Sequence, residues 1–117
     1  MAIINPADQN NYQQLLQQLL GLLLNQAYPA GQGVAAKDAI IDVAGDVHDI
    51  LTTLNQGALD SATPQYAALK TDVAAVNTNL NNVKVQISNW IQGVGIAAQV
   101  VSVIGQVAIA AARIGLL

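Results

Sequence analysis

The sequence contains no cysteine, no glutamate and no phenylalanine, and His48 is its single histidine. Without cysteine the chain can form neither a disulfide nor a thiolate metal site. Its serines have no evident general base in the pattern, and one histidine cannot build the constellation that nucleophilic or metal-assisted catalysis needs. We therefore predict that the protein is not an enzyme and has no catalytic residue, no cofactor, no metal site and no small-molecule substrate.

Charge is also scarce, because only 9% of the residues are charged whereas 53% are hydrophobic. Seven aspartates against four lysines and arginines give a formal net charge of −3. This acidic balance argues against a nucleic-acid partner, which needs a basic face, and against adsorption to anionic lipid through a polybasic surface. Polarity comes mainly from asparagine and glutamine, and copies of such a surface repel one another weakly, which favours self-association.

Residues 1–11 lack the basic start and the following apolar core of a cleavable secretory signal. We therefore expect a chain that is either cytoplasmic or exported by a route that needs no cleavable signal. The absence of cysteine is compatible with both compartments.

No stretch alternates apolar and polar residues for long enough to propose a sheet, so the predicted class is all-α. A first helix is predicted over about 6–25, because Asn5 can cap its free amides and Pro6 suits the first helical position. A loop follows at 27–33, where a proline and two glycines oppose helix continuation. A second helix is predicted over about 35–55, with an apolar seam formed by Ile40, Val43, Val47, Ile50 and Leu54.

The third predicted helix covers 63–117, or about 80 Å at about 1.5 Å per residue, and it starts at a threonine cap followed by Pro64. Gly93 and Gly95 weaken it by roughly 1 kcal/mol each. We expect a kink at 93–95 or a continuous helix rather than a reversal, for which so short a segment is too tight. The predicted fold is a single-domain helical bundle, 1–117, in which an antiparallel helix pair folds onto one long coiled-coil-like C-terminal helix.

Apolar residues of the third helix recur over 66–108 at alternating steps of three and four. The flanking positions are polar up to about Asn89 but apolar or small from Ile91 onward, and no charge occurs between Lys84 and Arg113. A helix that is apolar nearly all round must be buried in a bundle, in an oligomer or in lipid. We therefore assign 90–117 as an assembly or membrane segment, with the candidate residues Trp90, Val94, Ala97, Val101, Ile104, Gly105 and Ala108.

A narrow polar stripe interrupts this segment at a spacing of seven, and it consists of Gln92, Gln99, Gln106 and Arg113. In a soluble bundle the stripe would be the solvated edge, or its amides would bond across an interface and fix the register. In a membrane pore it would line water while the other faces met lipid. Length allows the second interpretation, because 93–112 supplies the roughly 20 residues that a spanning helix needs.

A neutral coiled-coil helix, 63–89, that runs into an Ala/Gly/Val-rich apolar segment, 90–117, resembles subunits of bacterial α-helical pore-forming toxins. The resemblance implies self-assembly together with membrane insertion. We therefore expect a non-enzymatic, self-assembling protein whose C-terminal helix mediates homo-oligomerisation, with membrane lipid as a second partner. The alternative is a soluble structural or adaptor module that buries this helix against a different protein.

Overall fold

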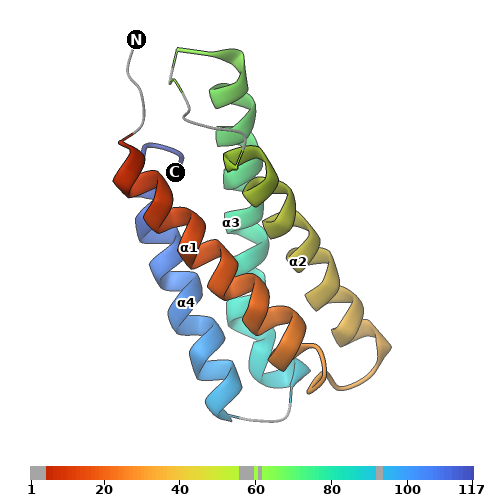
Figure 1. Cartoon of the computed structure of the whole chain (residues 1–117). Helices are drawn as coiled ribbons and strands as arrows, with labels where there is room; N and C mark the ends of the chain where they lie inside the picture. The colour runs from red at the N-terminus through yellow and green to blue at the C-terminus, as the bar shows by residue number, and fades with distance from the viewer. Residues whose placement is uncertain (1–4, 56–59, 61, 92–93) are drawn as a thin grey trace.

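The computed structural model describes residues 5–55, 60, 62–91 and 94–117. These residues form four α-helices and no strand, which confirms the predicted all-α class (Figure 1). The helices are α1 Pro6–Leu22, α2 Val34–Leu54, α3 Pro64–Trp90 and α4 Val94–Arg113. One π-helical turn, η1 Leu23–Ala27, extends α1 slightly beyond the end predicted for the first helix.

The helix starts follow the predicted capping residues. The Asn5 side chain accepts a hydrogen bond of 2.9 Å from the Ala7 amide, and Pro6 opens α1. The Thr63 hydroxyl accepts one of 3.2 Å from the Tyr66 amide, and Pro64 opens α3. In both places a side-chain oxygen satisfies an amide that has no partner within the helix, and proline occupies a position that needs no amide donor.

The prediction of one long C-terminal helix is wrong, because α3 ends at Trp90 and α4 runs back beside it (Figure 1). The whole molecule is only 47 Å long, far less than the expected length of that helix. Residues 92–93, which include part of the predicted kink, lie outside the described residues. Ile91 leaves the helix in an extended conformation with φ −128° and is buried at 3% exposure. The buried Ile91 therefore marks the end of α3. Because the chain reverses there, α4 packs against both α3 and α1.

The turn after α3 is tied to the loop between the first two helices. The Gln32 amide donates a hydrogen bond of 2.6 Å to the Trp90 carbonyl, and Gly31 forms an isolated antiparallel bridge with Ile91. These bonds use backbone groups that the end of α3 would otherwise leave without partners. The two connections at this end of the bundle hold each other in place.

The helices form a closed bundle in which each one packs against two neighbours, in the order α1, α2, α3, α4. The core confirms the predicted seam of the second helix, where Ile40, Val47 and Leu54 are buried. It also confirms the seam of the third up to position 87, where the buried residues are Leu69, Val73, Val76, Leu80, Val83 and Ile87. The inner side of α1 is lined by Tyr12, Leu16 and Leu19.

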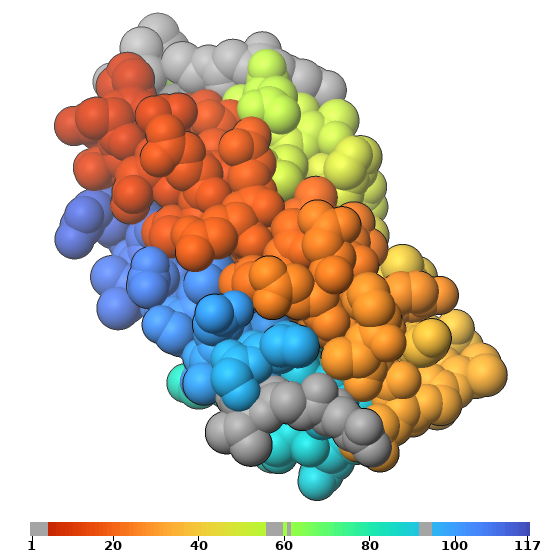
Figure 2. Space-filling model, turned by 60° about the horizontal axis from the view of Figure 1, so that its bottom comes forward, coloured from red at the N-terminus to blue at the C-terminus, as the bar shows by residue number. Residues whose placement is uncertain are grey.

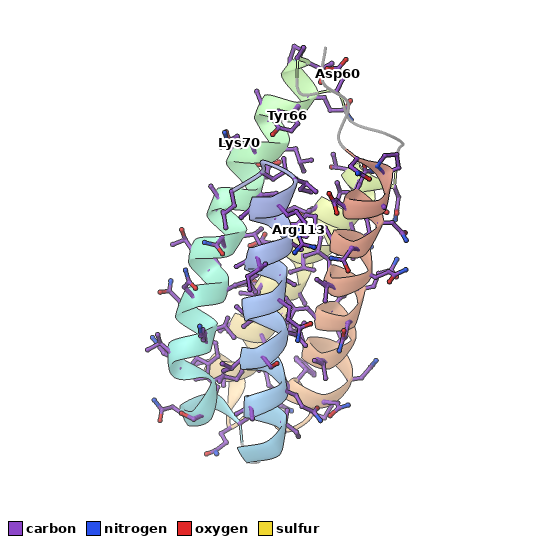
Figure 3. The ribbon with its side chains drawn as sticks, turned by 90° about the vertical axis from the view of Figure 1, so that its left-hand side faces the viewer. Asp60, Tyr66, Lys70 and Arg113 are labelled. Atoms are coloured by element: carbon purple, nitrogen blue, oxygen red, sulfur yellow. The ribbon has the colours of Figure 1, made fainter. Side chains whose placement is uncertain are left out.

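The last turn of α4 is closed by a Schellman motif around Gly115. The Leu116 amide donates to the Ala111 carbonyl at 3.0 Å, and the Gly115 amide donates to the Ala112 carbonyl at 3.1 Å. Leu116 is fully buried, and the Tyr66 hydroxyl of α3 donates a hydrogen bond of 2.7 Å to the Gly115 carbonyl. The end of α4 is thereby fastened to the start of α3, where Figure 3 shows Tyr66.

We expect Gly115→Ala and Gly105→Ala to change stability in opposite directions. Gly115 has φ 78°, and a Cβ there would lie 2.9 Å from the Tyr66 hydroxyl, so its replacement should cost about 1–2 kcal/mol. Gly105 lies within α4 with open space around its Cβ position, so alanine should stabilise the fold by about 0.5–1 kcal/mol. Urea unfolding of both variants measures this, and shifts of the same sign would contradict it.

Candidate interaction face on helices α1 and α4

The residues predicted for the assembly segment lie on more than one side of α4. Ala97 and Ile104 are buried, whereas Val101, Gly105 and Ala108 are partly exposed. Trp90 is partly exposed at the end of α3, and the side chain of Val94 lies outside the described residues. The buried side of α4 is formed by Ala97, Val100, Val103, Ile104, Val107, Ala110 and Ala111, and the buried Ile114 follows directly after the helix.

The turn after Trp90 explains this difference. The prediction extended the three- and four-residue spacing of α3 past Trp90 without interruption. Because α4 is a separate helix, its buried side does not follow that spacing. A pattern started anew at α4 passes through Val100, Ile104 and Val107, which the continued seam partly missed. The apolar flanking positions were the available signal for the true buried side.

The polar stripe is exposed and lies beside α1. Gln99, Gln106 and Arg113 are exposed, and Gln92 lies outside the described residues. Figure 3 shows Arg113 on the side of α4 next to α1. The stripe therefore faces the seam between the first and last helices, which are far apart in sequence but lie side by side on the surface (Figure 2).

Two shallow hollows follow this seam, with volumes of about 310 and 210 Å³. The first is lined by Gln18, Leu22, Gln99, Ser102, Val103 and Gln106. The second is lined by Asn11, Leu15, Gln106, Ile109, Ala110 and Arg113. Gln106 lines both, so the hollows adjoin along the seam and together make a groove lined by side-chain amides and apolar residues. We call the surface formed by these residues of α1 and α4 the α1–α4 face.

This face carries almost no charge. Asp8 is the single charged residue of α1, and Arg113 is the single charged residue of α4. Helices α2 and α3 carry eight charged residues, namely Lys37, Asp38, Asp42, Asp46, Asp49, Lys70, Asp72 and Lys84. Because Asp8 and Arg113 cancel, the whole formal charge of −3 belongs to the rest of the chain. The bundle therefore has one neutral side and one acidic side.

The outward surface of α4 is apolar or small as well as uncharged. Ile109 is 64% exposed, and Ala98, Ser102 and Ala112 are exposed elsewhere along the same helix. Small side chains let a second helix approach closely, and an exposed isoleucine gains about 25 cal/mol for each Å² of apolar surface that a partner covers. An uncharged amide costs less to desolvate than a charged group. The α1–α4 face is suited to contact with another protein surface.

A further hollow lies between α2 and α3. It is lined in part by Asp46, Asp49 and Asp72, and the Asn79 amide donates a hydrogen bond of 3.3 Å to Asp46. No group of three or more His, Asp or Glu side chains within the described residues is arranged to hold a metal ion. His48 is exposed on α2. The acidic side is a solvated surface.

Tyr12 is the most deeply buried titratable side chain of α1, with 1% of its surface exposed. Burial raises the pKa of its hydroxyl above the ordinary tyrosine value, because the charged form would lose its hydration. Tyr12 packs in the hydrophobic core.

Comparison with protein-family models, with curated proteins and with solved structures finds no match.

We expect Tyr12→Phe to flatten the alkaline loss of stability. In the unfolded chain Tyr12 ionises above about pH 10, whereas in the fold it stays neutral, so its contribution is intact below that pH and is lost above it. Above about pH 10 the free energy of unfolding should fall more steeply with pH in the wild type than in Tyr12→Phe, by up to about 1.4 kcal/mol per pH unit. Urea titrations between about pH 8 and 11 measure it, and equal slopes would contradict this origin.

Proposed function

We propose that this protein is a non-enzymatic, self-assembling helical protein that associates through the α1–α4 face, with α4 as its main assembly element. The observation that carries the proposal is the separation of charge, with a neutral, amide-lined groove on one side and an acidic surface on the other. Contact between two neutral faces places the acidic sides of both copies far from each other. Contact between two acidic sides would bring like charges together.

The size of the face supports a stable contact. The molecule measures 47 × 21 × 20 Å, so one long side is large enough for the roughly 800 Å² per partner that a standard protein interface buries. Gln106 lines both hollows and so lies near the centre of the face, and Ile109 lines the hollow that also contains Arg113. The amides of the face are uncharged, so a partner can cover them at a lower cost than charged groups.

We expect Ile109→Lys to weaken self-association strongly and Val85→Lys to leave it unchanged. The two side chains are matched, because both are highly exposed, at 64% and 77%, and both lie on helices. Ile109 lies on the α1–α4 face, whereas Val85 lies on α3, outside it. A lysine buried at the contact would lack a partner and should cost about 2 kcal/mol or more per copy.

Light scattering and sedimentation over a range of concentrations measure the effect. A wild type that stays monomeric at every concentration would overturn self-assembly and favour the adaptor function, in which the same face binds a different protein. Equal weakening by both variants would show that the α1–α4 face is not the contact.

A second candidate function is insertion of α4 into a membrane. Of the described helices, α4 has the length and composition to cross a bilayer: its segment Gly95–Arg113 has a mean hydropathy of 1.8. Part of this apolar surface packs against the other helices of the bundle, which bury 39% of the segment. Insertion therefore requires α4 to leave α1 and α3, and a covalent link between α4 and α1 should prevent it.

We expect such a link to abolish release of dye from liposomes. Asn11 and Gln106 line the same hollow, so cysteines placed there can be bridged by a short bismaleimide in this cysteine-free chain. The matched control bridges Asp49→Cys and Asp72→Cys, which connect α2 to α3 and leave α4 free. Release that is lost only with the first bridge supports insertion. No release by the unbridged protein, or equal release with both bridges, would contradict it.

A further inference from the structure

We infer that the assembled form is a closed dimer whose twofold axis runs parallel to the helices, so that α1 of each copy lies against α4 of its partner. This inference rests on the proposed self-assembly, and it specifies that a second copy of the chain binds the α1–α4 face and how the two copies are oriented. In a twofold dimer each copy covers the interaction face of the other, so neither face remains free to bind a third copy. The α1–α4 face would therefore give a dimer rather than a ring or a filament.

Two charges at one end of the face carry the inference: Arg113 lines the second hollow, and Asp8 lies three residues before Asn11 and so on the same side of α1. Asp8 lies in the first turn of α1 and Arg113 in the last turn of α4. Because these helices are antiparallel, both residues lie at the same end of the bundle (Figure 1). Asp8 is partly exposed and Arg113 is exposed, and no ion pair joins either of them to another described residue. Two opposite charges at one end of an otherwise neutral face are thus available to a partner.

Only one of the two ways of placing the face against itself pairs these charges. With the axis parallel to the helices, α1 faces the partner's α4 and the same ends meet, so Asp8 lies opposite the partner's Arg113 on both sides. With the axis across the helices, α1 faces the partner's α1 with its ends reversed, and each charge meets an uncharged end. Charge complementarity therefore selects the parallel axis.

The amides of the groove fit the same arrangement. Gln18 and Gln99 line one hollow and therefore lie at the same height in the bundle. In the parallel dimer Gln18 lies opposite the partner's Gln99, and a side-chain amide can both donate and accept a hydrogen bond. Paired amides lose little on desolvation and fix the register of the two copies, as a polar residue does at a helix interface.

Mixed single-cysteine variants test the geometry directly, because the chain has no cysteine of its own. Asn11 and Gln106 line the same hollow, so in the parallel dimer Asn11→Cys on one copy and Gln106→Cys on the other should form a disulfide under mild oxidation. In the crossed arrangement Asn11→Cys would instead couple with Gln18→Cys. A mixture of Gln106→Cys and Val85→Cys is the control, and it should remain uncoupled.

A charge exchange tests the rim contacts. Asp8→Lys and Arg113→Asp should each weaken dimerisation by roughly tenfold, because two exposed ion pairs become like-charge contacts. The double variant Asp8→Lys/Arg113→Asp should regain the affinity of the wild type, and raising the salt concentration should reduce the difference between each single variant and the wild type. Single and double variants of equal affinity would overturn the charge pairing.

The outcomes separate this inference from the proposed function. Coupling of Asn11→Cys with Gln18→Cys in a wild-type-like dimer would overturn the parallel geometry and leave self-assembly through the α1–α4 face intact. A wild type that stays monomeric, or a dimer that couples only through Val85→Cys, would overturn both.

Discussion

The fold depends on the burial of α4. This helix has no charged residue before Arg113, and its inner side, from Ala97 to Ala111, has to be removed from water. It packs against α1 and α3, and within the described residues those two helices meet only through α2 and α4. Placing α4 between them closes the bundle and completes the core. The capping bonds and the loop contacts fix the ends of an arrangement that this burial requires.

The two sides of α4 differ in composition, because one faces the core and the other faces outward. Its inner side is lined by valine and isoleucine, and its outer side carries alanine, serine, glutamine and the exposed Ile109. Together these make a helix that resembles a membrane span in composition, although 39% of its apolar segment is buried by the bundle. Burial in the core accounts for the apolar residues on the inner side of α4. The neutral outer side is the part that the core does not explain, and it is the basis of the functional proposal.

Local patterns predicted the parts of the structure that depend on neighbouring residues. Asn5, Pro6 and Thr63 marked helix starts, and the spacing of three and four residues identified the buried sides of α2 and α3. The seam failed beyond Trp90 because residues on α3 and α4 kept the heptad spacing across a turn, and spacing alone does not distinguish a turn from a kink. Ile91 carried the missing information, since its burial against the loop at Gly31 is a contact across 60 residues of sequence.

The α1–α4 face could not be predicted from sequence patterns, because it also depends on contacts between segments that are far apart in the chain. Gln99, Gln106 and Arg113 were recognised as a stripe, but Asn11 and Gln18 were assigned only to the first helix. The groove exists because α1 and α4 are neighbours, and this follows from the reversal of the chain rather than from either helix. The separation of neutral and acidic sides is likewise a property of helix order around the bundle.

If residues 91–93 became helical, α3 and α4 would join into the single straight helix that the heptad pattern describes, and α4 would leave its place between α1 and α3. The vacated site would accept α4 from another molecule with the same core contacts, because the two sequences are identical. Compact and exchanged forms of this chain would differ mainly in the conformation of that turn, so the bridge between Ile91 and Gly31 and the hydrogen bond from the Gln32 amide to the Trp90 carbonyl favour the compact form.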